Sequence, residues 1–192
     1  MEKKFELTDN FIINAFGVKL FQIKCTKSFK YAKEGDLGGY VEKDENLDQE
    51  SDAWVSGDAR VSGNARVSGN AWVSGDAEVS GDARVYGNAW VSGDARVYGN
   101  AEVSGDAEVS GDAEIDNNNK HCGFDCFGSA NRHTHAYLTK ENKVEITCGC
   151  FRGSIEEFEK RVEETHSGTI YEKQYKAIID VIKIKFGLTD LI

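Results

Sequence analysis

The sequence lacks proline altogether, although average usage would place roughly ten prolines in 192 residues. This absence excludes polyproline segments and rigid proline-rich linkers. Long apolar runs are also missing. The nearest approach, Phe11 to Val18, is interrupted by Asn14 and is far shorter than the ~18 residues of a membrane helix. We therefore expect no membrane partner.

Basic side chains are scarce relative to acidic ones. Lys and Arg total 23 against 33 Asp and Glu, so the net charge is −10. A duplex nucleic-acid binder neutralises phosphates with basic groups, so this balance argues against that class. The charged start lacks the apolar core of a signal peptide, and five cysteines make an odd number. We expect a cytoplasmic protein without a disulfide framework.

Charge divides the chain into three segments. Residues 1–36 carry a net charge of +2 and residues 119–192 a net charge of zero, whereas residues 37–118 hold 5 basic and 17 acidic groups. We predict an N-terminal β cap over 1–36, a repeat domain over 37–118 and a small C-terminal domain over 119–192.

The middle segment is a hexapeptide repeat. From Ala53 to Asp112 the pattern Ala-x-Val-[Ser/Tyr]-Gly-[Asp/Asn] recurs without interruption, and it fades by Asn118. Ala and Val lie two residues apart, so they share one face of a short strand. Gly and Asp/Asn tolerate the positive φ that a corner needs. The pattern predicts strands and corners that coil into a prism with Ala and Val inside.

The outward residues predict the number of sides. The only tryptophans are Trp54, Trp72 and Trp90, and consecutive ones are separated by three hexapeptides. Charged residues recur with the same period in two further columns: Arg60, Glu78, Arg96 and Glu114; and Arg66, Arg84 and Glu102. Opposite charges on adjacent coils would pair along a column. Recent duplication with drift is the other explanation for the alternating charges.

On these residues, segment 53–118 resembles the hexapeptide-repeat, left-handed parallel β-helix family. The resemblance implies a triangular, left-handed helix with three hexapeptides per coil, and a homotrimer. A right-handed helix of the bacterial polymer-forming type is the alternative. We expect Leu37, Val41 and Leu47 to begin a degenerate first coil.

Gly35-Asp36-Leu37-Gly38-Gly39 and Cys148-Gly149-Cys150-Phe151-x-Gly153 are similar to segments of uncharacterised bacteriophage and prophage proteins. This second resemblance implies a viral context and supplies no chemistry.

The flanking segments predict two caps. Residues 11–25 alternate around Phe16-Gly17, as do 134–138 and 143–148 around a turn, so each predicts a hairpin. Ser154 and Glu157 form a capping box that starts a helix, and Gly187 ends a second helix. We therefore predict a mainly β chain: a parallel β-helix, an N-terminal β-hairpin cap and a C-terminal α+β domain of ββαα order.

Metal and nucleophile chemistry is confined to the flanks, because no His or Cys lies between residues 36 and 120. The coils therefore lack a general base and metal ligands, and we do not expect an enzyme. Four later thiols have an unorthodox spacing for zinc: Cys122, Cys126, Cys148 and Cys150. Plain buried thiols are the main expectation and no cofactor is required; zinc, or a Cys150 nucleophile beside a His, are the alternatives.

The Trp column predicts a homotrimer interface, because exposed apolar patches mark interaction sites. Intramolecular packing and ligand stacking are the alternatives. The Asp residues of one corner column either satisfy corner backbone groups or hold calcium: Asp58, Asp76, Asp94 and Asp112.

Together these features predict a non-enzymatic, oligomeric scaffold whose C-terminal domain binds a host protein or small molecule. The rare residue types lie mostly outside the repeat, and five of them are candidate contact residues: Cys150, Phe151, His166, Tyr171 and Tyr175. An enzyme with its site in 119–192 and a virion structural component are the alternatives.

Overall fold

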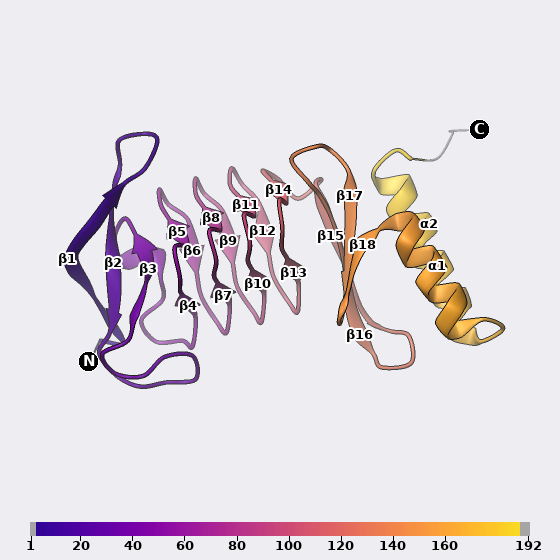
Figure 1. Cartoon of the computed structure of the whole chain (residues 1–192), viewed down its shortest axis with the longest axis horizontal. Coiled ribbons are helices and arrows are strands. Elements are labelled where there is room, and N and C mark those ends of the chain that lie inside the picture. Colours follow the sequence, from indigo (N-terminus) through magenta and orange to yellow (C-terminus); the bar gives the residue numbers. More distant parts are fainter. Residues whose placement is uncertain (1–2, 189–192) are drawn as a thin grey trace. The chain divides into compact units, whose positions relative to one another are not determined.

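The computed structural model describes residues 3–188. The chain forms two compact units, divided between Asn117 and Asn118. Figure 1 shows the strands of the first unit numbered along the chain. Residues 3–36 belong to the same unit as the coils.

The repeat forms eleven two-residue strands, one in each hexapeptide. They are β4 (Trp54–Val55), β5 (Arg60–Val61), β6 (Arg66–Val67), β7 (Trp72–Val73), β8 (Glu78–Val79), β9 (Arg84–Val85), β10 (Trp90–Val91), β11 (Arg96–Val97), β12 (Glu102–Val103), β13 (Glu108–Val109) and β14 (Glu114–Ile115).

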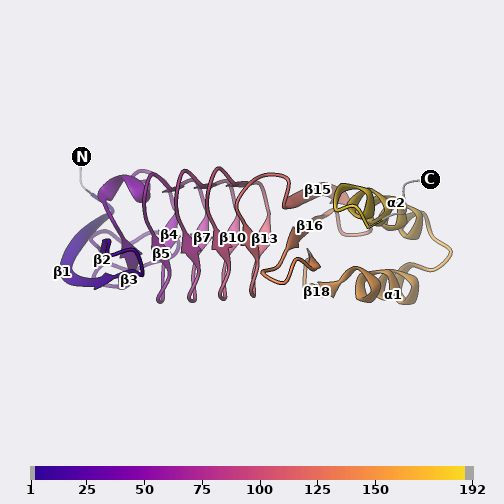
Figure 2. The same cartoon turned by 90° about the horizontal axis from the view of Figure 1, so that it is seen from above.

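These strands form three parallel sheets, which are the sides of a prism. One side holds β4, β7, β10 and β13, the second β6, β9 and β12, and the third β5, β8, β11 and β14. Figure 2 shows β4, β7, β10 and β13 side by side. Trp54 pairs with Trp72 and Trp72 with Trp90, so the predicted coil of three hexapeptides is confirmed.

The prism is filled by the Ala and Val of the repeat, each at most 1% exposed. The coil glycines have φ between 62° and 73°. This left-handed conformation turns the chain at each corner, and glycine adopts it without steric cost. The burial of Ala and Val confirms that these positions of the repeat point inward.

Opposite outward charges form ion pairs along the columns, whereas Arg66 lies opposite the like-charged Arg84. The Arg60 guanidinium lies 3.0 Å from a Glu78 carboxylate oxygen, Arg96 lies 3.9 Å from the other Glu78 oxygen, and Arg84 lies 3.6 Å from Glu102. These groups are largely exposed, so each pair contributes at most about 1 kcal/mol. Their main effect is to favour one register.

The N-terminal strands extend one side of the prism. β1 (Phe5–Ile13) and β2 (Lys19–Cys25) form the predicted hairpin, and β2 pairs antiparallel with β3 (Leu37–Val41). β3 in turn pairs parallel with β5. A short 3₁₀ helix, η1 (Asp44–Asn46), follows.

The degenerate first coil is present with one correction. Val41 and Leu47 are buried and pair with Val61 and Val67. Leu37, however, is 56% exposed. The inward position of the coil alanine is taken by Gly39, where an added Cβ would lie 2.6 Å from the Ala59 carbonyl oxygen.

Lys4 joins the N-terminus to this first coil. Its side chain is buried, and Nζ donates to the carbonyl oxygens of Asp48, Ser51 and Ala53 at 2.6–2.7 Å. Burial lowers the pKa of Lys4 to about 8.

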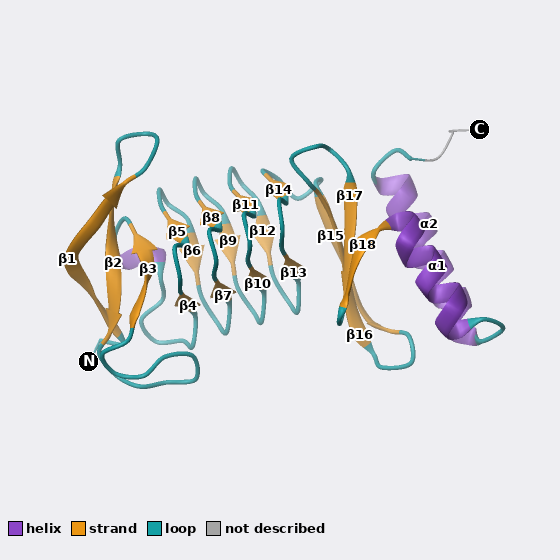
Figure 3. Cartoon of the chain, in the orientation of Figure 1, coloured by secondary structure: helices purple, strands orange, loops and turns teal. Residues whose placement is uncertain are grey.

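The second unit is a four-stranded antiparallel sheet followed by two helices (Figure 3). Its elements are β15 (His121–Phe127), β16 (Arg132–Leu138), β17 (Val144–Cys148), β18 (Phe151–Ser154), α1 (Ile155–His166) and α2 (Ile170–Lys185). The β16–β17 hairpin and both helices are confirmed, whereas the ββαα order omits β15 and β18. Gly123 interrupts the alternation of β15, and β18 has only four residues, so the pattern of either strand is weak.

The helices pack on one face of this sheet. Ile155, Phe158 and Val162 of α1 are buried against Ile178 and Ile182 of α2 and the apolar face of the sheet. Among residues 3–188, no helix is long and apolar enough to cross a membrane.

Candidate functional site

The Trp column is partly covered by its own chain. In the loop between β2 and β3, Phe29 packs edge-on against Trp54 with ring centroids 5.4 Å apart, and Tyr31 stacks on Trp72 at the same distance. Trp54 is therefore only 2% exposed. The predicted oligomer face is wrong at Trp54, because the side chain is already buried within the subunit.

The remaining aromatic surface lies farther along the column. Trp72 and Trp90 stack with centroids 5.6 Å apart and planes 8° from parallel, and Trp90 is 42% exposed. Their indole nitrogens donate to Ser56 and Ser74 Oγ, at 2.7 and 3.2 Å. These bonds fix both rings, so Trp90 presents a preorganised apolar surface.

A cavity of about 250 Å³ lies in the C-terminal unit, bounded by α1, α2 and the sheet. The buried side chains of Cys148, Phe158, Val162 and Tyr175 form its floor. The exposed residues around it are Arg132, Cys150, Arg161 and Thr165, and half-buried Phe151 and His166 complete the lining.

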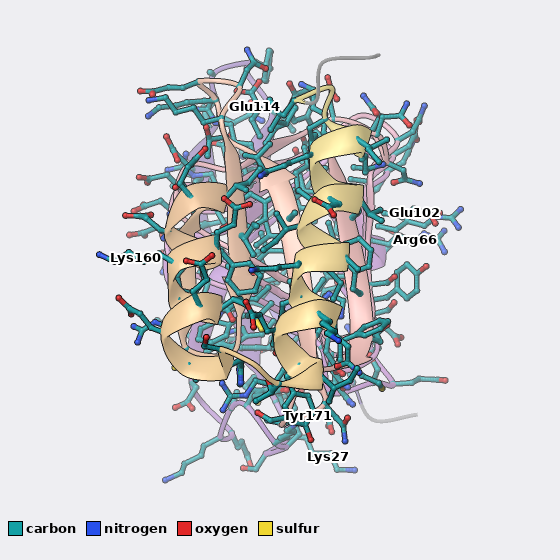
Figure 4. The ribbon with its side chains drawn as sticks, turned by 90° about the vertical axis from the view of Figure 1, so that its right-hand side faces the viewer. Lys27, Arg66, Glu102, Glu114, Lys160 and Tyr171 are labelled. Atoms are coloured by element: carbon teal, nitrogen blue, oxygen red, sulfur yellow. The ribbon has the colours of Figure 1, made fainter. Side chains whose placement is uncertain are left out.

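Four of the five predicted contact residues line this cavity: Cys150, Phe151, His166 and Tyr175. The fifth, Tyr171, lies outside the lining and packs edge-on against His166, with centroids 5.9 Å apart. Figure 4 shows the two helices side by side with Tyr171 at one end.

Tyr175 is the central side chain of the floor. Its ring meets that of Phe158 edge-on at 5.6 Å and stacks with His166 at 5.5 Å. Its hydroxyl lies 3.9 Å from Cys148 Sγ, which accepts a hydrogen bond from Thr134 at 3.3 Å. Burial, with the Cys148 thiol beside it, raises the pKa of Tyr175 to about 12, so the phenol is neutral at physiological pH.

The four thiols considered for zinc do not gather in one site, and the expectation of buried thiols is wrong for Cys126 and Cys150. Cys148 is buried in the helix-side core, which Cys122 packs against, whereas Cys126 and Cys150 are exposed. Within the described part of the chain, no three or more His, Cys, Asp or Glu side chains are placed to hold a metal ion. The same finding applies to the Asp column considered for calcium. Burial raises the pKa of Cys122 to about 11, which favours an inert thiol.

Three histidines form a row on the sheet face opposite the helices. His133 Nδ1 lies 2.5 Å from Asp125 Oδ1, and 3.2 Å contacts join His133 Nε2 to His135 Nδ1 and His135 Nε2 to His121 Nδ1. The ionised Asp125 carboxylate can only accept hydrogen bonds. Three neutral imidazoles in this row would therefore each donate a hydrogen bond through Nδ1. The bare acceptor would then be His121 Nε2, which is buried and has no partner.

Burial shifts the pKa of two histidines of this row. It lowers the pKa of His121 to about 4 and that of His135 well below the ordinary value. The sequence predicts Cys and His crowding here but misses the row, because the alignment depends on the pairing of β15 with β16. An alternating His133-x-His135 on a strand was the available signal.

Comparison with known proteins supports the repeat alone. Residues 59–75 and 77–93 match the family model described as YdcK β solenoid repeat. No curated protein matches the chain. The match lies within coil strands, so it supports the β-helix and leaves the C-terminal cavity to be interpreted from its own residues.

Proposed function

We propose that this protein is a non-enzymatic, oligomeric β-helix scaffold whose C-terminal unit binds a partner through the cavity around Tyr175. The observation that carries the proposal is the cavity itself. It combines a buried aromatic floor with exposed polar groups around it, the usual composition of a ligand site.

The coils have the features of a scaffold. Their surface repeats with every coil, so it offers few singular sites, and ion pairs join Arg60 to Glu78 and Arg84 to Glu102 on adjacent coils. We further propose that the helix is left-handed and that the exposed Trp90 surface assembles three subunits. Three cavities in one assembly would raise avidity if the partner engages them together.

The resemblance to phage and prophage proteins extends the proposal to its setting. The partner is a host protein or small molecule in the host cytoplasm, and sequestration of that molecule, or interference with host defence, is the outcome. Detection of the chain in purified virus particles would favour the structural alternative.

An enzyme is the second candidate, because Cys150 and His166 line the same cavity. Among the described residues, no hydrogen bond joins this thiol to this imidazole. A nucleophile without its base is weakly activated, which favours binding over catalysis. Cys150→Ser separates the two: a binder keeps its affinity, whereas a cysteine enzyme loses turnover while assembly stays intact.

Native mass spectrometry of the full chain purified from its host cells tests the proposal. We expect a trimer that carries a bound molecule. Thr165→Trp, an exposed change in the cavity lining, should remove the bound molecule because the indole fills the opening. Glu164→Trp is the matched control, since its neighbouring exposed position lies outside the lining.

Deleting the whole coil 71–88 keeps the remaining hexapeptides in phase, so partner binding should survive. Binding that persists in Thr165→Trp would overturn the assignment. If binding is also lost when the coil is deleted, the recognition surface is the β-helix face instead.

A further inference from the structure

Resting on the proposed function, we infer that the cavity around Tyr175 takes a small organic anion: a carboxylate or phosphate on a flat apolar body. Arg132 and Arg161 hold the anionic group, and the aromatic floor holds the body.

The described residues that line the cavity include basic side chains and no acidic ones. Arg132, Arg161 and His166 line the cavity, and no Asp or Glu of the described residues does. The chain as a whole has a net charge of −10. A cavity with two guanidinium groups and no carboxylate in so acidic a protein is complementary to an anion.

Neither guanidinium is neutralised elsewhere. Among the described residues, no ion pair is made by Arg132 or Arg161, whereas the nearby Arg152 pairs with Glu145. Guanidinium groups recognise carboxylate and phosphate through paired N–H donors, so two free ones are suited to one anionic group.

Local backbone geometry makes room for Arg132. Gly149 has φ 60°, and an added Cβ there would lie 2.5 Å from Arg132 Nη1 and 2.8 Å from its Cδ. The Arg132 side chain therefore lies directly against the turn between β17 and β18, which limits its freedom before any ligand binds. Less side-chain entropy is then lost on binding.

The floor selects the rest of the ligand. Phe158 and Val162 are buried, and the His166 ring stacks on Tyr175. The volume of about 250 Å³ is below the range of roughly 300–1,000 Å³ for drug-sized ligands. A single aromatic ring with one anionic group matches this size.

Titration calorimetry of the full chain with benzoate, phenyl phosphate, benzamide and benzylamine tests the inference. We expect both anions to bind, and the neutral and cationic analogues to bind at least about tenfold more weakly, because hydrogen bonds to charged groups are the strong ones. Affinity for benzoate should also fall as salt is added.

Arg132→Gln and Arg161→Gln should each weaken benzoate binding by about tenfold or more. Lys160→Gln is the matched control. It removes the same charge from the adjacent position of α1, yet Lys160 extends away from α2 (Figure 4) and does not line the cavity. Both arginines are exposed, so circular dichroism should show all three variants folded.

Equal binding of benzamide and benzoate, no binding of either anion, or equal effects of Arg161→Gln and Lys160→Gln would overturn the inference. If a bound molecule is still displaced by Thr165→Trp, the proposed function stands and only the ligand class is wrong. If Thr165→Trp displaces nothing, the proposed function itself fails.

Discussion

Gly93 and Gly105 provide a direct test of what holds the coils in contact at their corners. Both have φ +68°, so alanine at either position costs about 1–2 kcal/mol of backbone strain. At Gly93 the added Cβ would lie 2.8 Å from the Gly111 nitrogen and 3.1 Å from its oxygen. At Gly105 nothing lies within 4 Å.

The difference between the two variants therefore isolates the contact between coils. Forcing a methyl group into a packed site costs about 1–3 kcal/mol. We expect Gly105→Ala to lower the free energy of unfolding by about 1–2 kcal/mol and Gly93→Ala by about 2–5 kcal/mol. The effect of the substitution on the unfolded chain is the same for both and cancels.

Urea unfolding followed by tryptophan fluorescence measures this difference, because all three tryptophans lie in coil strands. Equal destabilisation by the two variants would refute the reasoning. It would mean that the positive φ alone, and not the close approach of the next coil, explains why glycine is needed at position 93.

Three further predictions concern the core, the histidines and assembly. Val79→Asp should unfold the coils, because it buries an unpaired charge, whereas Glu78→Gln should cost less than about 1 kcal/mol in the same urea assay. Burial lowers the pKa of His121 to about 4 against an ordinary value of 6.5. The unfolded chain therefore binds the proton first, and the stability of the C-terminal unit should fall by up to about 3 kcal/mol between pH 6.5 and 4. The helix signal in far-ultraviolet circular dichroism reports this loss of stability. In His121→Gln the loss of stability between the two pH values should be smaller. If the proposed trimer forms through the Trp90 surface, Trp90→Glu should yield monomers by light scattering. A monomeric unmodified chain would contradict the proposed interface.

The coils could be predicted from sequence because each constraint in them is local. Ala and Val at a spacing of two, followed by Gly, define strand and corner within one hexapeptide, and the Trp period defines the sides. The buried valines and the pairing of Trp54, Trp72 and Trp90 follow directly.

The features outside the coil pattern depend on contacts between residues distant in sequence. Nothing near Trp54 indicates that Phe29 covers it, and nothing near Lys4 indicates its three carbonyl partners. The sequence predicts four of the lining residues as rare side chains of the C-terminal domain. It does not single out Arg132 and Arg161, because a charged residue on a strand or helix is usually a solvated one. Their significance appears only when β16 and α1 are placed together.

The coil of three hexapeptides also determines how length can vary without loss of surface chemistry. One added coil would separate the β1–β2 hairpin from β14 by a further ~4.8 Å and leave every column in phase. One added hexapeptide would instead rotate all later side chains by a third of a turn, and the tryptophans and charges would meet the wrong partners. Chains built on this repeat can therefore act as spacers of graded length, adjustable in whole coils while each side keeps its own chemistry.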